Sequence, residues 1–344
     1  MDSASQGSNR EDEPDLTPQS FPVPPAPTEE ELQLFYSRVE ASGVRPAIFM
    51  VLPHYCKMFV PPCNREPQLF CNLSCPEARS EDLPALVSRS EMFLAELQVS
   101  EEMVNYVESS TRMQSKCPKW YAYRAGRITA SVKKSVCCTS TDTPSVSLIK
   151  RICNPYKQKL SASATAWGLR HEFDALCSYA RGRKKHHLNF SYSKTGVWLS
   201  TPNLVLTASP DALVQCRCCG KGTTEVKFPL SIVTVGLQAA CSKTDFCFEH
   251  ANANLHLKRT HSYYYQIQTQ MAVCGASYCD FVVWSPTFIR IERVSRDDTF
   301  FQGVLPRAQK FFTDVILPEL FEEYFTRKEM ENPGKRTDAE SFCY

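Results

Sequence analysis

The chain has 344 residues, 43% of them hydrophobic, which is enough to bury a substantial core in one or two domains. Its 39 basic and 37 acidic side chains leave a formal net charge of +2, which argues against a protein that attracts nucleic acid through a strong overall positive field. No apolar signal segment precedes the 17 cysteines, so we expect reduced thiols and an intracellular location, in the nucleus or cytoplasm. No run of about 18 apolar residues occurs, so we predict no transmembrane helix and no membrane partner.

The N-terminal part of the chain differs in composition from the rest. Residues 1–28 are rich in Pro, Ser, Asp and Glu, which predicts a disordered tail. Thr28 followed by E-E-E-L predicts a capped amphipathic helix, and Ser100 begins another. We assign residues 29–115 to a helical N-terminal accessory region.

Helical and strand patterns alternate through residues 116–327, which predicts an α/β sandwich around a mixed sheet. A buried run at 278–284 and an alternating run at 288–294 predict a hairpin. A long amphipathic segment at 297–327 is expected to be interrupted near Pro306 and Pro318. Other helices are expected at 145–153, 163–180 and 261–275, and other strands near 188–199, 204–215 and 223–228. Residues 328–344 are assigned to a flexible tail.

The most informative pattern is T-A-S-P-D-A-L-V at 207–214 followed by E-V-K at 225–227. Side chains alternate faces along a strand, so Glu225 and Lys227 point the same way. If the strand that carries Asp211 lies beside them, Asp211 and Glu225 can hold a divalent cation with the main-chain carbonyl of Val226. Such hard oxygen ligands predict Mg²⁺ or Mn²⁺ and not zinc.

These residue types suit the hydrolysis of a phosphodiester, which needs a nucleophile at neutral pH and positive charge near the phosphorane. An ammonium such as Lys227 beside the attacking water can orient it, lower its pKa or accept its proton. By itself the pattern is weak, because a surface hairpin with unrelated charges would look the same.

Two helical segments flank this pattern. In 163–180, Glu172 falls on the same face as Leu169 and Leu176, where a carboxylate is costly unless it is paired or bound to metal. The alternative is a glutamate at the edge of the apolar stripe that reaches solvent. In 261–275, Gln266 lies on a polar face, and its amide can bond both a phosphate oxygen and a water molecule unless that face is merely solvated.

The order of these motifs resembles the YqaJ-like viral recombinase family, relatives of phage lambda exonuclease among the PD-(D/E)XK nucleases. The segment W-Y-A-Y-R-A-G-R-I-T-A-S at 120–131 is similar to the opening of that family's nuclease domain. The resemblance implies a PD-(D/E)XK, restriction-endonuclease-like core at 116–327, with a mixed central sheet flanked by helices.

The resemblance also implies roles for individual residues. Glu172, Asp211 and Glu225 correspond to metal-coordinating carboxylates for two Mg²⁺ or Mn²⁺ ions, Lys227 to the catalytic lysine, and Gln266 to the catalytic-helix glutamine. Ala212 departs from the family's usual glycine, which puts a Cβ where that backbone is normally freer.

In the exonuclease branch of the family, an arginine and two serines bind the terminal 5′-phosphate. The matching residues are Arg124, Ser131 and Ser209, and a guanidinium fork with hydroxyl donors suits a phosphate dianion. Trp120 matches the aromatic residue beside the DNA end, although an ordinary core tryptophan is an equal alternative.

The function that the resemblance implies is a Mg²⁺-dependent 5′-to-3′ exonuclease on double-stranded DNA ends, acting in recombination or mobile-element replication. The implied partners are duplex DNA, a single-strand-annealing protein and further copies of the chain in a ring of three. Two alternatives stay open: a structure-specific endonuclease of the same fold, and an inactive nucleic-acid-binding or assembly protein.

A basic cluster follows the Glu172 helix and is either a contact for the DNA backbone or a solvated loop. Its members are Arg181, Arg183, Lys184 and Lys185.

Three cysteines, Cys216, Cys218 and Cys219, occupy an expected hairpin turn. A zinc site with Cys241 or Cys247 as fourth ligand is one interpretation. We favour free turn cysteines, because the spacing lacks the familiar C-x₂-C pair.

Overall fold

The computed structural model describes residues 25–44, 46–55, 66–74, 81–157, 162–251 and 254–331. The chain divides into two compact units, Met1–Pro61 and Pro62–Tyr344. Of the two tails expected from composition, only 25–28 and 328–331 lie within the described residues.

The first unit contains helix α1 (Glu29–Ala41), which begins at the predicted cap. The Thr28 hydroxyl accepts a hydrogen bond from the Glu31 amide at 3.3 Å, and the Glu31 carboxylate accepts one from the Thr28 amide at 2.8 Å. Tyr36 on α1 packs edge-on against Phe49 and Tyr55, which stack on one another with their ring centroids 4.4 Å apart. These aromatic contacts form the small core of this unit.

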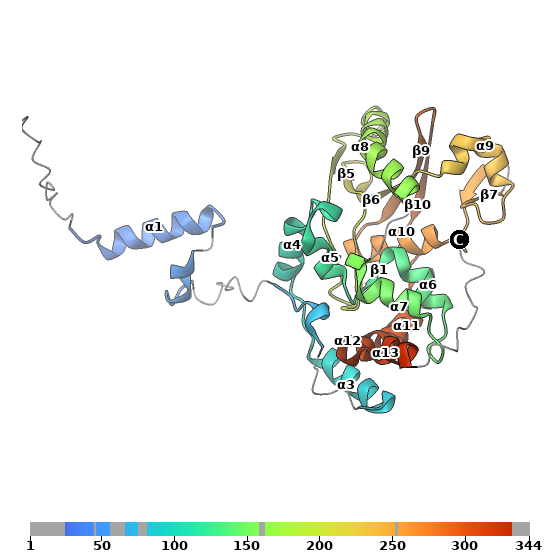
Figure 1. The fold of residues 1–344 in the computed structure, drawn as a ribbon. Coiled ribbons are helices and arrows are strands. Elements are labelled where there is room, and N and C mark those ends of the chain that lie inside the picture. The colour runs from blue at the N-terminus through green and yellow to red at the C-terminus, as the bar shows by residue number, and fades with distance from the viewer. Residues whose placement is uncertain are drawn as a thin grey trace, which may run out of the picture. The chain divides into compact units, whose positions relative to one another are not determined.

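A five-stranded mixed sheet dominates the second unit (Figure 1). Its order is β10-β9-β6-β5-β2, in which β6 and β9 are parallel and the other neighbours are antiparallel. The predicted hairpin is present as β9 and β10, and the expected α/β class with a mixed central sheet is confirmed. The strands are β2 (Ser191–Ser193), β5 (Ala212–Cys216), β6 (Gly220–Lys227), β9 (Tyr278–Ser285) and β10 (Phe288–Ser295).

Two helices cover this sheet on opposite faces, α8 (Ala162–Lys184) and α10 (Ser262–Cys274). Every residue of β9 is buried, because its alternate side chains enter two different cores. Val282 packs in the cluster that includes Leu176 of α8, whereas Phe281 packs in the cluster that includes Ile267 of α10.

A second sheet has the order β1-β4-β3, with β1 parallel to β4. Its strands are β1 (Ile128–Thr129), β3 (Trp198–Leu199) and β4 (Leu206–Ala208). A separate hairpin is formed by β7 (Phe248–Ala251) and β8 (Asn254–Leu257), which the sequence patterns did not predict.

Further helices surround these sheets. Those at Val146–Cys153 and Glu101–Ser110 agree with prediction, and Ser100 caps the latter by accepting from the Met103 amide at 3.3 Å. The set consists of α3 (Leu83–Glu96), α4 (Glu101–Ser110), α5 (Pro118–Arg124), α6 (Lys133–Cys138), α7 (Val146–Cys153) and α9 (Leu230–Cys241).

The C-terminal helices correct one expectation. Helix α11 (Asp298–Phe311) runs through Pro306 without a break, because burial of Phe301 and Leu305 offsets the one lost hydrogen bond. A π-helical turn at Phe312–Ile316 follows, and Pro318 lies in the first turn of α12 (Leu317–Glu322), where proline is tolerated. The last helix is α13 (Tyr324–Glu331).

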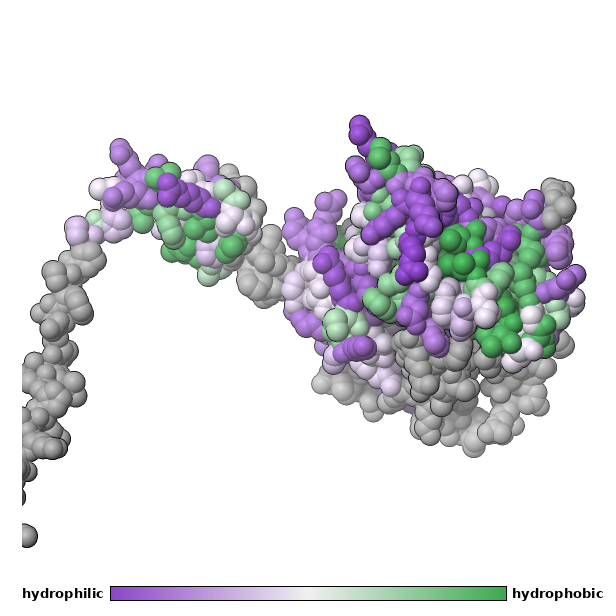
Figure 2. Space-filling model, turned by 90° about the horizontal axis from the view of Figure 1, so that it is seen from above, coloured by the Kyte–Doolittle hydropathy of each residue, from purple (hydrophilic) through white to green (hydrophobic). Residues whose placement is uncertain are grey.

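The surface seen in Figure 2 is mostly hydrophilic, with an apolar area toward the side that α9 occupies in Figure 1. Val233 and Val235 of α9 are each 48% exposed. Within the described part of the chain, no helix combines the length and apolarity needed to cross a membrane.

Candidate active site

Of the two predicted carboxylate residues, Asp211 directly precedes β5 and Glu225 lies near the end of β6. The strand register pairs Ala212 with Thr224, which places Asp211 opposite Glu225. The Val226 amide donates to Oδ2 of Asp211 at 2.7 Å, and Glu225 is only 4% exposed. The structure therefore brings together the two acidic residues that sequence spacing could only propose as neighbours.

Helix α10 supplies amide donors to the same carboxylate. Gln266 Nε2 donates to Oε1 of Glu225 at 2.6 Å, and Gln270 Nε2 donates to Oε2 at 2.7 Å. Lys227 Nζ lies 2.7 Å from Oε1 of Glu225, donates to Gln266 Oε1 at 3.2 Å, and sits 4.6 Å from the ring centroid of Tyr263. Gln270 was not among the predicted site residues, although its spacing of one helical turn from Gln266 is a sequence signal for it.

Charge is unevenly balanced in this cluster. Burial and the neighbouring Glu225 charge raise the pKa of Asp211 well above its usual range, although Lys227 and the Val226 amide act in the opposite direction. Burial acts to lower the pKa of Lys227, but Glu225, Tyr263 and Asp211 outweigh it, so the net shift is upward and the side chain is an ammonium at neutral pH. The two acidic groups, Asp211 and Glu225, thus share one ammonium, that of Lys227. Their hard carboxylate oxygens suit Mg²⁺ or Mn²⁺ as a further cation.

Glu172 lies at the edge of this cluster. Its side chain is 22% exposed and forms an ion pair with Lys194 at 3.2 Å. Leu176 is buried on the same helix, as predicted, whereas the side chain of Leu169 is outside the described part of the structure. The negative charge of Glu172 contributes to the raised pKa of Asp211, so it lies within electrostatic reach of that carboxylate. Lys194 has no motif around it and was not predicted.

A cavity of about 150 Å³ opens beside Asp211 and Gln266. The predicted phosphate-binding residues line it: Trp120, Arg124, Ser131 and Ser209. Arg124 Nη1 donates to Ser209 Oγ at 3.3 Å, and the guanidinium lies 4.0 Å from the ring centroid of Trp120. Ser131 is exposed, and its hydroxyl lies 3.1 Å from that of Thr129.

Two donors at this cavity are buried without a partner among the described residues, namely Nε of Arg124 and Nε1 of Trp120. Burial lowers the pKa of Arg124 to about 10, so the guanidinium is still a cation at neutral pH. Because buried polar groups are normally hydrogen-bonded, these donors mark a place suited to an anionic ligand.

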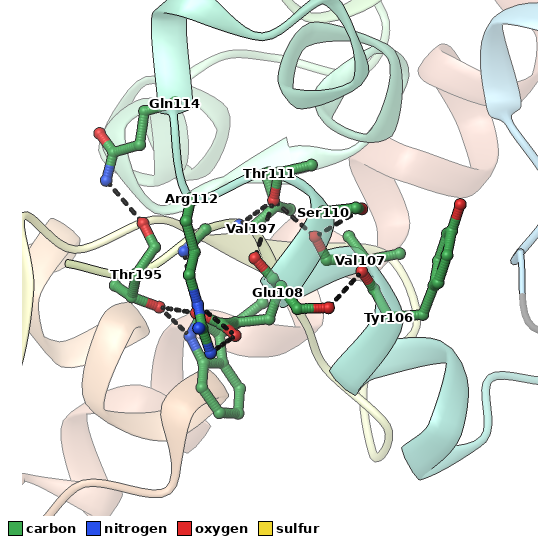
Figure 3. Close-up of polar contacts among 12 residues, drawn as sticks. Tyr106, Val107, Glu108, Ser110, Thr111, Arg112, Gln114, Thr195 and Val197 are labelled. Atoms are coloured by element: carbon green, nitrogen blue, oxygen red, sulfur yellow. Dashed lines mark hydrogen bonds and ion pairs between the residues drawn. The ribbon is translucent and has the colours of Figure 1, made fainter. Parts of the chain in front are cut away.

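Helix α4 and the turn after it fix the loop that leads into the site (Figure 3). Glu108 accepts hydrogen bonds from the Thr195 hydroxyl at 3.0 Å and from the Gly196 amide at 3.1 Å. Gln114 Nε2 donates to the carbonyls of Thr195 at 2.9 Å and of Pro210 at 3.2 Å. Pro210 precedes Asp211, so this amide anchors the backbone next to a candidate metal ligand. No sequence signal pointed to Gln114.

The predicted basic cluster forms the last turn of α8 and the residue after it, because α8 extends to Lys184, and the cluster is only partly available to a ligand. Arg183 forms an ion pair at 3.0 Å with Asp280, which is fully buried. Arg181, Lys184 and Lys185 are exposed. Arg183 therefore has a structural role in holding α8 on the sheet.

The mixed sheet, its flanking helices and the cluster of acidic residues and lysine at β5 and β6 agree with the PD-(D/E)XK core that the resemblance implies. Residues 119–277 match the family model of the YqaJ-like viral recombinase domain. This match agrees with the resemblance drawn from the motifs.

Several solved structures are similar to this chain. The alkaline exonuclease LHK-Exo of Laribacter hongkongensis, in complex with dAMP, is 23% identical, and the match covers 62% of this chain and 98% of that one with a TM-score of 0.44. The shutoff and exonuclease protein of Kaposi's sarcoma-associated herpesvirus is 13% identical. The match covers 70% of this chain and 77% of that one, with a TM-score of 0.43. A phage-related exonuclease from Haemophilus somnus 129PT is 14% identical. The match covers 55% of this chain and 95% of that one, with a TM-score of 0.37. No curated protein sequence matches the chain.

Proposed function

We propose that this protein is a Mg²⁺-dependent deoxyribonuclease that degrades duplex DNA from its 5′ ends. The observation that carries the proposal is that Arg124 and Ser209 line the same cavity, of about 150 Å³, as Asp211 and Gln266. A terminal phosphate bound by the guanidinium would lie next to the groups suited to hydrolysis.

The oxygen ligands proposed for two Mg²⁺ or Mn²⁺ ions are the carboxylates of Asp211 and Glu225 and the carbonyl of Val226, with Glu172 at the edge. The pairing of Asp211 with Glu225 supports this, because two adjacent acidic groups with one ammonium between them call for further positive charge. When bound, such a cation supplies positive charge that offsets the charge developing on the phosphate in the transition state.

The protein's own groups have separate roles in this proposal. Lys227, which holds its proton at neutral pH, would donate to the attacking water or a phosphate oxygen and stabilise negative charge there. Gln266 contacts both Lys227 and Glu225, so its amide would fix their orientation and position the water for in-line attack. Action in recombination or mobile-element replication, an annealing partner and a ring of three subunits stay predictions from the family resemblance.

Digestion of three DNA substrates tests the proposal: 5′-phosphorylated linear duplex, 5′-hydroxyl linear duplex and covalently closed circles, each with Mg²⁺ or with EDTA. We expect Mg²⁺-dependent release of mononucleotides, fastest from the phosphorylated ends, and none from circles. Cutting of circles would favour the endonuclease alternative. Absence of cleavage by folded protein, with DNA binding retained, would favour the inactive binding protein.

A further inference from the structure

Four side chains with metal-binding atoms converge at the turn of the β5–β6 hairpin. They are His187, Cys216, Cys218 and Cys219, and their ligand atoms all lie within 4.8 Å of one another. We propose that these four residues hold a structural zinc ion. The proposal is independent of the nuclease activity proposed above.

The distances within the cluster fit a tetrahedral site. Nδ1 of His187 lies 3.2 Å from Sγ of Cys218, 3.4 Å from Sγ of Cys219 and 3.6 Å from Sγ of Cys216. The sulfur of Cys218 lies 3.3 Å from that of Cys216 and 3.7 Å from that of Cys219. Zinc bonds of about 2.3 Å to sulfur and about 2.0–2.1 Å to nitrogen correspond to tetrahedron edges of about 3.8 Å between sulfurs and about 3.5 Å between sulfur and nitrogen. All three thiols are free, since a disulfide would need a sulfur separation of about 2.05 Å.

The backbone explains how an unusual C-x-C-C spacing reaches this geometry. Cys216 pairs with Gly220 across the hairpin, which leaves a tight turn of residues 217–219. Gly220 has a φ of 71°, a left-handed conformation that glycine adopts without strain. The Arg217 amide donates to the Leu188 carbonyl at 2.9 Å, and this bond holds the loop after α8 against the turn and presents His187.

A positively charged side chain supports the cluster from outside. Nη1 of Arg293 lies 3.0 Å from the sulfur of Cys219, and the same guanidinium donates to both oxygens of Asp280 at 2.8 and 3.0 Å. Tyr179 and Arg183 of α8 bind Asp280 as well, at 2.6 and 3.0 Å. Three thiolates and a neutral imidazole around Zn²⁺ would carry one net negative charge, which Arg293 offsets, as outer partners of metal ligands commonly do.

Ligand chemistry separates this site from the candidate active site. Thiolates and imidazole select zinc, whereas the oxygens of Asp211 and Glu225 select Mg²⁺ or Mn²⁺. Glu225 lies five residues beyond Gly220 on β6, which is about 17 Å along the strand. Four protein ligands would leave no open coordination position on the zinc ion, so the site would be structural. It would hold the segment after α8 against the hairpin next to the acidic residues.

The structure points to His187 as the fourth ligand, in place of Cys241 or Cys247, which the sequence suggested. Cys241 and Cys247 pack in the apolar cluster that includes Ile232 of α9, and His187 occupies the fourth position beside the turn cysteines. The sequence spacing favours free turn cysteines because it lacks a C-x₂-C pair, and it does not point to His187, which lies 29 residues before Cys216.

Metal analysis of the full-length protein, purified in reducing buffer without chelator, tests the proposal. We expect about one zinc per chain, which resists EDTA washing that removes Mg²⁺ and is released when a mercurial reagent titrates the thiols. Cys218→Ser and His187→Ala should weaken zinc binding at least tenfold in competition with a chelator. The matched controls Cys241→Ser and Cys247→Ala should keep it.

Cobalt substitution of the wild-type protein gives a second readout that does not depend on the folding of any variant. Co²⁺ should give the intense visible and thiolate charge-transfer bands of a tetrahedral S₃N site. Wild-type protein that binds neither Zn²⁺ nor Co²⁺ would overturn the proposal, as would His187→Ala that binds zinc as tightly as wild type. Recovery of Cys216 and Cys218 as a disulfide from reducing buffer would also overturn it.

Discussion

The ammonium of Lys227 lies 2.7 Å from the carboxylate of Glu225, two residues earlier on the same strand. Alternation along β6 puts both side chains on one face, and α10 packs against that face with Gln266 in contact with both. The acid, the amine and the amide therefore form one hydrogen-bonded unit beside Asp211.

Replacement of Lys227 by alanine should abolish most nuclease activity. The variant removes the cation next to Glu225, and the loss of one positioned hydrogen-bond donor that stabilises developing negative charge typically costs about 10²–10³-fold in rate. Single-turnover digestion of 5′-phosphorylated duplex measures the effect. Lys221→Ala, on the same strand but bonded to the carbonyl of Cys274, is the matched control and should stay within a few-fold of wild type. A Lys227→Ala rate close to that of Lys221→Ala would contradict the catalytic assignment.

Replacement of Arg124 by alanine should remove the preference for phosphorylated ends. Charge-assisted hydrogen bonds contribute about 1.5–3 kcal/mol, so digestion of 5′-phosphorylated duplex should slow about 10- to 100-fold. The 5′-hydroxyl duplex is the internal control, because it has no terminal phosphate for the guanidinium to bind. Equal slowing on both substrates would mean that Arg124 supports the fold and does not bind the terminal 5′-phosphate.

Mg²⁺ or Mn²⁺ should stabilise the protein through Asp211. The folded state raises the pKa of this carboxyl, so folding favours its protonated form. The stability that the protonated form adds to the folded protein is lost as the pH rises through the folded-state pKa. At pH 8 a divalent cation should therefore raise the melting temperature by ~3 °C or more, and Asp211→Asn should be more stable than wild type without metal but gain little from it. Differential scanning calorimetry in EDTA and in Mg²⁺ checks this, and an undiminished metal response in Asp211→Asn would contradict it.

His261 should make the stability of the protein sensitive to mild acid. Its ring nitrogen caps α10 by accepting from the Tyr263 amide at 3.1 Å, and burial, together with Lys134 and Lys258, lowers its pKa to about 4. Because the unfolded chain has an ordinary histidine pKa near 6.5, the unfolded state binds the proton more readily, and stability falls as the pH drops from about 6.5 to about 4. Urea unfolding measures the free energy of unfolding at pH 7.5 and at pH 5. The difference between the two values should be smaller for His261→Asn than for wild type, because asparagine keeps a capping side chain but does not titrate. The same pH difference in both proteins would rule His261 out as its source.

Gly196 should not tolerate a side chain. A Cβ built there would lie 2.1 Å from the carbonyl oxygen of Glu108, so Gly196→Ala must displace α4 from the loop before Asp211. We expect a loss of about 2 kcal/mol or more in the free energy of unfolding, measured by chemical denaturation. Gly303→Ala is the matched control, because a Cβ there meets nothing within 4 Å and helix α11 should gain up to about 1 kcal/mol. Similar stabilities for the two variants would refute the close packing at Gly196.

The sequence by itself determined the parts of this protein that depend on local periodicity. Alternation placed Glu225 and Lys227 on one face, helical spacing placed Gln266 on another element, and the caps at Thr28 and Ser100 began helices where predicted. These features follow from neighbours along the chain, so they are visible without a fold. Pro306 shows the limit of such reasoning, because burial of the surrounding helix outweighed a strong local signal.

Tertiary structure alone decided which distant side chains meet. The bond from Gln114 to the carbonyl of Pro210, the ion pair of Lys194 with Glu172 and the approach of His187 to the turn cysteines have no counterpart in local spacing. Each joins segments whose separation is set by the packing of α4 and α8 against the sheets. A residue's type limits what it can bind, whereas the packing of the elements determines which partners come within bonding distance.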